Sequence, residues 1–243
     1  MQYLIKLLIT GIFIYSSSLF AIEPVQVVTA NWKPYNYLEN GVLVGSGTAI
    51  VKAVFKEAQV PYKINVYPWA RTYKMAEKTP NTLIYTLVRV PMREKMFKWV
   101  RPIGMSDKVY FYQLANNTDA PQIKHINDLK KYRFGVVRNS INHQYLKQLG
   151  FKEGENLQPL RHQSLNLKQL MKGHLTFSVF AEDNLHQELS SLNIPKKKLR
   201  PALFLQDIRF YMSFNKNTPD SLVQKLQAAY DRLQQQGKIA IFK

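Results

Sequence analysis

The chain has 243 residues, of which 46% are hydrophobic, so one large domain or two small ones can bury a core. Cysteine is absent, which excludes disulfides, thiolate metal sites and a cysteine nucleophile. A formal net charge of +18 would suggest nucleic acid in a cytoplasmic protein, but the sequence has no RNA-binding, zinc-finger or helix-turn-helix pattern. The five histidines show no metal spacing such as HExxH, so neither a nucleic-acid partner nor a metal is expected.

The first 21 residues have the pattern of a secretory signal peptide. Lys6 gives a positively charged start, LLITGIFIY an apolar run, and SSSLFA a cleavage site after Ala21. An uncleaved membrane anchor is the alternative, but the apolar run is short for a spanning helix. We therefore expect a periplasmic protein. Removing Lys6 lowers the charge from +18 to +17, which fits attraction to anionic solutes or envelope surfaces, or a solvated basic face.

The first part of the mature chain predicts alternating strands and helices. Apolar runs and period-2 alternation favour strands at 25–30, 62–68 and 82–88. Apolar residues at helical spacing favour helices at 48–58 and 69–78. This alternation is typical of βαβ units and of a mostly parallel sheet.

A second α/β unit follows, and a helix closes the chain. Serine and glycine stand at the expected starts and ends of its helices, as N-caps and C-terminal glycines do. The expected elements are strands at 132–137 and 175–181, and helices at 140–150, 164–173, 184–192 and 220–236. Two such units predict two lobes.

Six segments of the mature chain carry a resemblance. They are NWKPYNYLENGVLVG, PWARTYKMA, VPMREKMFKWVRPI, IKHINDLKKYRFGVVRNS, LMKGHLTFSVFAED and TPDSLVQKLQAAYDRLQQQGKI. In this order they resemble the bacterial extracellular solute-binding proteins of the amino-acid-binding type, family 3, over residues 22–243. The resemblance implies an α/β fold of the type II periplasmic-binding-protein kind, whose two lobes close on a ligand by hinge motion.

The resemblance also implies where the chain divides. The first lobe is expected to take residues 22–107 and the returning segment 207–243, and the second lobe residues 108–206. Hinge crossings are expected near 108–112 and 203–210. Each lobe would hold a mostly parallel sheet flanked by helices, with the ligand in the cleft between the lobes.

Ligand contacts are implied in the same way, position by position. Trp32 falls where the family places an aromatic that packs on the ligand, and Arg93 where an arginine grips a carboxylate. The positions that supply main-chain or small polar contacts, or that open a second-lobe helix, are Thr86, Val88, Asn139 and Ser140. Trp69, at the start of the helix expected at 69–78, is a further candidate for the same cleft.

The chain departs from the family at the positions that bind an ammonium group. Family members often have an acidic residue in the first strand, where this chain has Thr29. Ala181 takes the place of a second-lobe aspartate, and Glu182 follows it. Glu182 is either a ligand partner or a solvated acid at a helix start. Amino acids and related carboxylates both stay open as ligands.

Arg89 and Arg93 follow the third expected strand, four residues apart. A guanidinium offers paired donors that match a carboxylate, and ligands of open α/β sheets bind beyond the carboxyl ends of strands. Arg93 is therefore expected in the cleft, while Arg89 is expected on the surface, where most charged side chains lie. The alternative for both is an ordinary solvated helix start.

The resemblance implies a monomeric periplasmic protein that captures a small polar or anionic metabolite, an amino acid or related carboxylate, for an inner-membrane ABC-type permease. No catalytic residue or cofactor is expected. Two alternatives stay open. One is a cyclohexadienyl-dehydratase-like enzyme on the same fold, for which Glu182 is the only obvious acid or base. The other is a ligand-sensing module for a membrane signalling partner.

Overall fold

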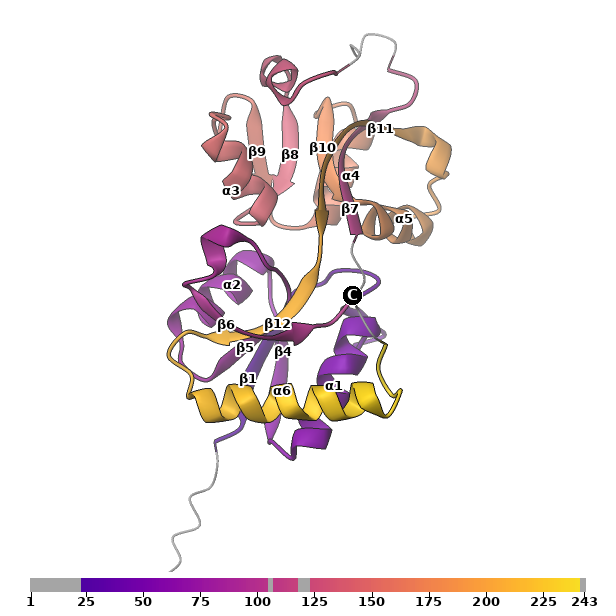
Figure 1. Cartoon of the computed structure of the whole chain (residues 1–243). Helices are drawn as coiled ribbons and strands as arrows, with labels where there is room; N and C mark the ends of the chain where they lie inside the picture. Colours follow the sequence, from indigo (N-terminus) through magenta and orange to yellow (C-terminus); the bar gives the residue numbers. More distant parts are fainter. Residues whose placement is uncertain (1–22, 105–106, 118–122, 241–243) are drawn as a thin grey trace, which may run out of the picture.

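The structure is a computed structural model that describes residues 23–104, 107–117 and 123–240. The expected signal peptide, residues 1–21, lies outside the described part. Two lobes lie one above the other, each built on its own five-stranded sheet (Figure 1). None of the described helices is long and apolar enough to cross a membrane.

The first lobe is the lower one in Figure 1, and its sheet is dominated by parallel strands. In sheet order the strands are β4 (Tyr62–Val66), β1 (Val25–Thr29), β5 (Thr82–Val88), β12 (Phe210–Asn215) and β6 (Phe97–Pro102). β1 pairs in parallel with β4 and β5, whereas β12 is antiparallel to both of its neighbours. Every residue of β5 is buried, as expected for a strand covered on both faces.

Three helices cover the first sheet, and all three were predicted. They are α1 (Ser46–Ala58), α2 (Trp69–Lys78) and the closing helix α6 (Asp220–Gln235). α1 and α6 pack on each other at the bottom of the lobe, and α2 packs on β1 and β5 (Figure 1). A small hairpin, β2 (Tyr37–Glu39) and β3 (Val42–Val44), precedes α1.

The second lobe repeats this design. Its strands in sheet order are β11 (Leu199–Ile208), β7 (Asp107–Leu114), β10 (Phe177–Ala181), β8 (Phe134–Val137) and β9 (Leu157–Leu160). β8, β9 and β10 are parallel, and β7 is antiparallel to both β10 and β11. Its helices are α3 (Ile141–Gln148), α4 (Gln163–Met171) and α5 (Glu182–Ser191), with the short 3₁₀ turns η2 (Ile126–Lys131) and η3 (Lys196–Lys198).

The chain passes between the lobes twice. It leaves the first sheet at the end of β6, Pro102, and enters the second with Asp107 at the start of β7. It returns where β11 ends at Ile208 and β12 begins at Phe210, and Figure 1 shows this long path running down from one lobe to the other. The carboxyl ends of β5, β8 and β10 therefore meet at the interface between the lobes.

Candidate functional site

A cavity lies between the lobes at the ends of the central strands. Its described wall is drawn from both lobes and both crossings: Trp32, Trp69, Thr86, Val88, Arg93, Val109, Val136, Val137, Ser140, Ile141, Asn142, Gln163, Val179, Ala181, Ile208 and Phe210. The cavity volume is about 30 Å³, so the lobes lie close together around it. Hinge motion that separates the lobes would open the cavity to a ligand.

Hydrogen bonds between the lobes hold the closed arrangement. The Trp69 indole N–H of the first lobe donates to the main-chain carbonyl of Asn139 in the second, at 3.1 Å. The Asn184 amide donates to the Lys33 carbonyl at 2.7 Å, and the Lys33 ammonium donates to the Ser191 hydroxyl at 2.9 Å. These bonds join two first-lobe segments, the loop before β2 and the start of α2, to two second-lobe segments, α5 and the turn after β8.

Arg93 is the one charged residue in the described wall of the cavity. It ends the 3₁₀ turn η1 (Pro91–Arg93) directly after β5, and its side chain is 1% exposed. Nη1 donates to the Val88 carbonyl at 3.1 Å, while Nε and Nη2 are buried without a partner among the described residues. The guanidinium lies 5.0 Å from the ring centroid of Tyr73. Burial lowers the pKa of Arg93 below its usual value.

A buried guanidinium with two unused donors is costly, because its desolvation is offset by neither a counter-charge nor a full set of hydrogen bonds. The unused Nε–H and Nη2–H groups belong to the planar fork that binds carboxylates with two parallel bonds. The observed geometry therefore favours an anion with two acceptor oxygens in the cavity.

Thr86 lies in β5 with left-handed backbone geometry, at φ 61°. Such a conformation is unusual for a β-branched residue and is found mainly at functional sites. Its hydroxyl hydrogen-bonds Asn36 Oδ1, and Asn36 Nδ2 donates in turn to the Thr29 hydroxyl at 2.8 Å and to the Ala30 carbonyl. Buried side-chain hydrogen bonds thus hold the first-lobe wall.

The two tryptophans approach the cavity from different elements of the first lobe. Trp69 begins α2 and is 8% exposed. Trp32 lies in a tight turn closed by hydrogen bonds to Asn36, and its ring meets Phe210 edge-on at 6.2 Å between centroids. The Trp32 indole N–H is buried without a partner among the described residues, so it is a further free donor at the cavity.

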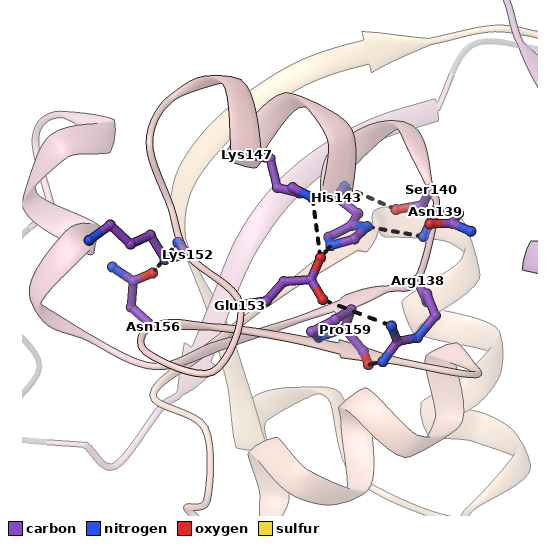
Figure 2. A network of polar contacts seen from close by, with 9 residues as sticks. All are labelled: Arg138, Asn139, Ser140, His143, Lys147, Lys152, Glu153, Asn156 and Pro159. Carbon is purple, nitrogen blue, oxygen red and sulfur yellow. Dashed lines mark hydrogen bonds and ion pairs between the residues drawn. The ribbon is translucent and has the colours of Figure 1, made fainter.

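The second-lobe wall depends on the turn between β8 and α3, shown in Figure 2. Asn139 has a left-handed φ of 57°, and the Ser140 hydroxyl caps α3 by accepting from the His143 main-chain N–H at 3.2 Å. His143 Nδ1 accepts from the Asn139 main-chain N–H at 3.1 Å, and Nε2 lies 3.1 Å from Glu153. Because Nδ1 is an acceptor, the proton of neutral His143 lies on Nε2 and donates to Glu153.

Glu153 is shared by three basic side chains, which Figure 2 shows converging on it. It pairs with His143, with Lys147 at 3.4 Å and with Arg138 at 3.8 Å. The pKa of Glu153 is lowered by these neighbours against the opposing effect of burial. Burial lowers the pKa of His143, so the neutral ring required by the Asn139 hydrogen bond is the favoured form.

The predicted ligand residues are mostly gathered in one place. The six that line the cavity are Trp32, Trp69, Thr86, Val88, Arg93 and Ser140. Asn139 lies directly behind the wall, where its carbonyl accepts from Trp69. Glu182 begins α5 and lies outside the wall, although its neighbour Ala181 is part of it. Arg89 is exposed and forms two hydrogen bonds to Glu94, at 2.9 and 3.0 Å.

Several wall residues were not predicted from the sequence. Ile141 and Asn142 directly follow Ser140, so their position in the chain was the available signal. Phe210 and Gln163 have no such signal, because they reach the cavity from the second crossing and from the start of α4.

Comparison with known families places this architecture. The model of bacterial extracellular solute-binding proteins, family 3, matches residues 25–243. The chain belongs to this family. A search of curated protein sequences finds no match, so the family assignment rests on the family model.

Solved structures share the fold of this family 3 protein over most of its length. A histidine kinase sensor domain with similarity to periplasmic binding proteins is 15% identical, with a TM-score of 0.77, 89% of this chain and 92% of that one covered. ArtJ from Geobacillus stearothermophilus, an arginine-, lysine- and histidine-binding protein, is 18% identical with a TM-score of 0.73, covering 89% and 91%. AbpA from Streptococcus pneumoniae, bound to L-arginine, is 18% identical with a TM-score of 0.70, covering 88% and 90%.

Proposed function

We propose that this protein is a periplasmic solute-binding protein that captures a small carboxylate between its lobes and presents it to an inner-membrane ABC-type permease. Membership of the family supports the binding role. The observation that carries the proposal is the buried guanidinium of Arg93, with Nε and Nη2 unpaired at the cavity.

Carboxylate capture explains why these donors are left free. A carboxylate placed against Nε and Nη2 would supply the counter-charge and two acceptors, in the bidentate geometry that gives the strongest such contacts. The free indole N–H of Trp32 adds a third donor at the same cavity. Binding would therefore satisfy the buried groups that the empty site leaves unpaired.

Lobe closure couples the binding event to recognition by a partner. With the ligand bound, the Trp69–Asn139 hydrogen bond and the contacts of Lys33 would hold the lobes together. A permease that recognises the closed surface can then distinguish loaded from empty protein, because ligand binding shifts the population towards closure.

A thermal-shift screen tests this proposal. Amino acids, monocarboxylates and dicarboxylates are added singly to the mature protein, and at least one should raise the melting temperature, because a ligand that binds only the folded state stabilises it. A screen in which only amines or neutral sugars respond would contradict carboxylate capture.

A sensory role is the second candidate, and the similarity to a histidine kinase sensor domain favours it. Deleting the gene separates the two. Loss of uptake of the labelled ligand indicates transport, whereas unchanged uptake with loss of a ligand-dependent transcriptional response indicates sensing.

The dehydratase alternative needs an acid or base at the cavity, and Glu182 lies outside its described wall. We expect no aromatic product on incubation with prephenate or arogenate. Product formation that is lost in Glu182→Gln would overturn the choice of a binding protein.

A further inference from the structure

The fully buried polar atoms left unpaired on the described wall residues share one chemical property. Arg93 Nε, Arg93 Nη2 and Trp32 Nε1 are all hydrogen-bond donors. A ligand that satisfies them must present acceptors. An ammonium group presents three donors and no acceptor, so it cannot satisfy any of these three atoms.

The described wall also lacks a counter-charge for an ammonium group. No aspartate or glutamate is among its residues, and Arg93 is its one charged side chain. The polar groups present are partly used: the Ser140 hydroxyl accepts from the His143 N–H, and Asn142 Oδ1 accepts from Gln206 at 3.1 Å. Gln163 Nε2 donates to the Val179 carbonyl at 2.7 Å, which leaves Gln163 Oε1 as an acceptor without a charge. A desolvated ammonium without a carboxylate partner is strongly unfavourable.

Two positions that could have supplied an acid hold other residues. Thr29 ends β1 and uses its hydroxyl to accept from Asn36, and Ala181 occupies the wall at the end of β10. The nearby carboxyl groups of Asp107 and Asp183 lie outside the wall and face the Tyr35 hydroxyl, at 3.3 and 3.5 Å. The electrostatic balance at the cavity is therefore one positive charge, which matches one carboxylate.

Most of the remaining wall is apolar. Aliphatic and aromatic side chains from both lobes and both crossings close it, including Val109, Val136, Ile141, Val179, Ile208 and Phe210. Burial of apolar ligand surface here would favour binding through the hydrophobic effect, whereas a second charge or a hydroxyl-rich body would be desolvated with few partners.

We propose, on the basis of the carboxylate-capture function above, that the ligand is a small apolar monocarboxylate that lacks an ammonium group, such as a branched aliphatic or aryl-substituted acid. Arg93 binds the carboxylate, and the apolar wall encloses the hydrocarbon body. The charge balance and the fully buried unpaired donors both disfavour an ordinary α-amino acid.

Calorimetric titration with matched ligands tests this class. One set is 4-methylpentanoate, L-leucine, which differs from it only by the α-ammonium, and isopentylamine, which lacks the carboxylate. A second set is 3-phenylpropanoate, L-phenylalanine and phenethylamine. In at least one set the plain acid should bind at least tenfold more tightly than its amino acid, and the amines should not bind.

The outcomes separate the ligand class from the underlying function. Binding of an amino acid as tight as that of its plain acid, or tighter, would overturn the class while leaving carboxylate capture standing. If no carboxylate of either set binds, the ligand class is overturned, and carboxylate capture is then decided by the thermal-shift screen, which also contains dicarboxylates and other amino acids. Retained binding of the plain acid in Arg93→Ala would contradict both the class and carboxylate capture, because the acid would then be held elsewhere.

A charge-restoring variant sharpens the test. Ala181→Asp places a carboxylate in the cavity wall, and it should shift the preference towards the amino acid by at least tenfold relative to the natural protein. Ala181→Asn is the matched control, since it has the same size without the charge, and it should not shift the preference. An equal shift in both variants would contradict the charge argument; if neither variant folds, the ligand sets on the natural protein decide it.

Discussion

Two segments on opposite sides of the cavity are built alike and held differently. Each has a non-glycine residue in left-handed backbone, Thr86 in the first lobe and Asn139 in the second. Thr86 is held by Asn36 through hydrogen bonds between neutral, buried side chains. Asn139 is held by His143, an ionisable ring that Glu153 supports from behind.

The two lobes therefore contribute differently to ligand binding. The first lobe carries the positive charge of Arg93, and its wall at Thr86 is held by neutral side chains. The second lobe contributes a neutral, mostly apolar wall whose turn depends on the protonation state of one histidine. We therefore expect the first lobe to determine which ligand charge is bound. We expect pH to change ligand affinity through the second lobe.

Removing the Arg93 guanidinium should have the largest effect, a loss of ligand affinity. Arg93→Ala should weaken carboxylate binding by about 2–5 kcal/mol, the range for breaking a desolvated charge pair, and Arg93→Lys should also weaken it because a point charge cannot reproduce the fork. Calorimetric titration measures both. The unliganded variants should stay folded, since relief of a buried unpaired charge offsets the lost bond to Val88.

The next largest effect is expected on stability, when the Asn36 side chain that supports Thr86 is removed. Asn36→Ala leaves buried partners unsatisfied at Thr29, Ala30 and Thr86, and it should lower the free energy of unfolding by about 2 kcal/mol, measured by urea denaturation. Asn31→Ala is the control in the same loop, because its hydrogen bond to Leu38 is exposed. Equal losses in the two variants would argue against a special support for Thr86.

Acidification should weaken the hydrogen bond between His143 and Asn139 in the second lobe. Burial lowers the pKa of His143, so its contribution to stability is complete above the unfolded-state pKa of about 6.5 and is lost as the pH falls through the folded-state value. Protonation puts a hydrogen on Nδ1, which then cannot accept from Asn139. Binding measured from pH 8 to 5.5 should weaken more in the natural protein than in His143→Gln.

Other ionisable groups do not obscure that comparison. Glu153, Lys147 and Arg138 lie around position 143 and are common to both proteins. Burial raises the pKa of Asp107 to about 6, so this group titrates in the same range, but it is also common to both. If the pH dependence is identical in the natural protein and in His143→Gln, His143 does not cause it.

The smallest effect is expected at the neighbouring arginine. Arg89 pairs with Glu94 on the surface, with 43% and 40% of the two side chains exposed. Arg89→Ala should change ligand affinity by nothing measurable and stability by less than about 1 kcal/mol. A loss of affinity like that of Arg93→Ala would mean that both arginines bind the ligand.

The sequence allowed the parts of this fold with strong local signals to be predicted. Helix 69–78 has the observed bounds of α2, and the strand expected at 82–88 has those of β5, because their apolar patterns are long and regular. Several elements were missed, among them β6 and β12 with six residues each and some shorter strands. The β2–β3 hairpin has three residues in each strand, and β9 contains a proline in a four-residue strand, too little for a periodic pattern.

The binding site likewise contains residues that could be predicted from the sequence and residues that could not. Arg93 follows a predicted strand, so the rule that ligands bind at strand ends pointed to it, whereas Ser140 was identified through the family resemblance. Phe210 and Gln163 reach the cavity through tertiary packing of distant segments, which no local pattern encodes. The unpaired state of Nε and Nη2 in Arg93 is likewise a property of the folded protein.

A crystal structure with the tightest-binding carboxylate from the titrations tests the central claim most directly. The account predicts one carboxylate with its two oxygens about 2.7–2.9 Å from Nε and Nη2 of Arg93, between closed lobes. A ligand bound elsewhere, or an Arg93 guanidinium still without an anionic partner when the ligand is bound, would contradict it.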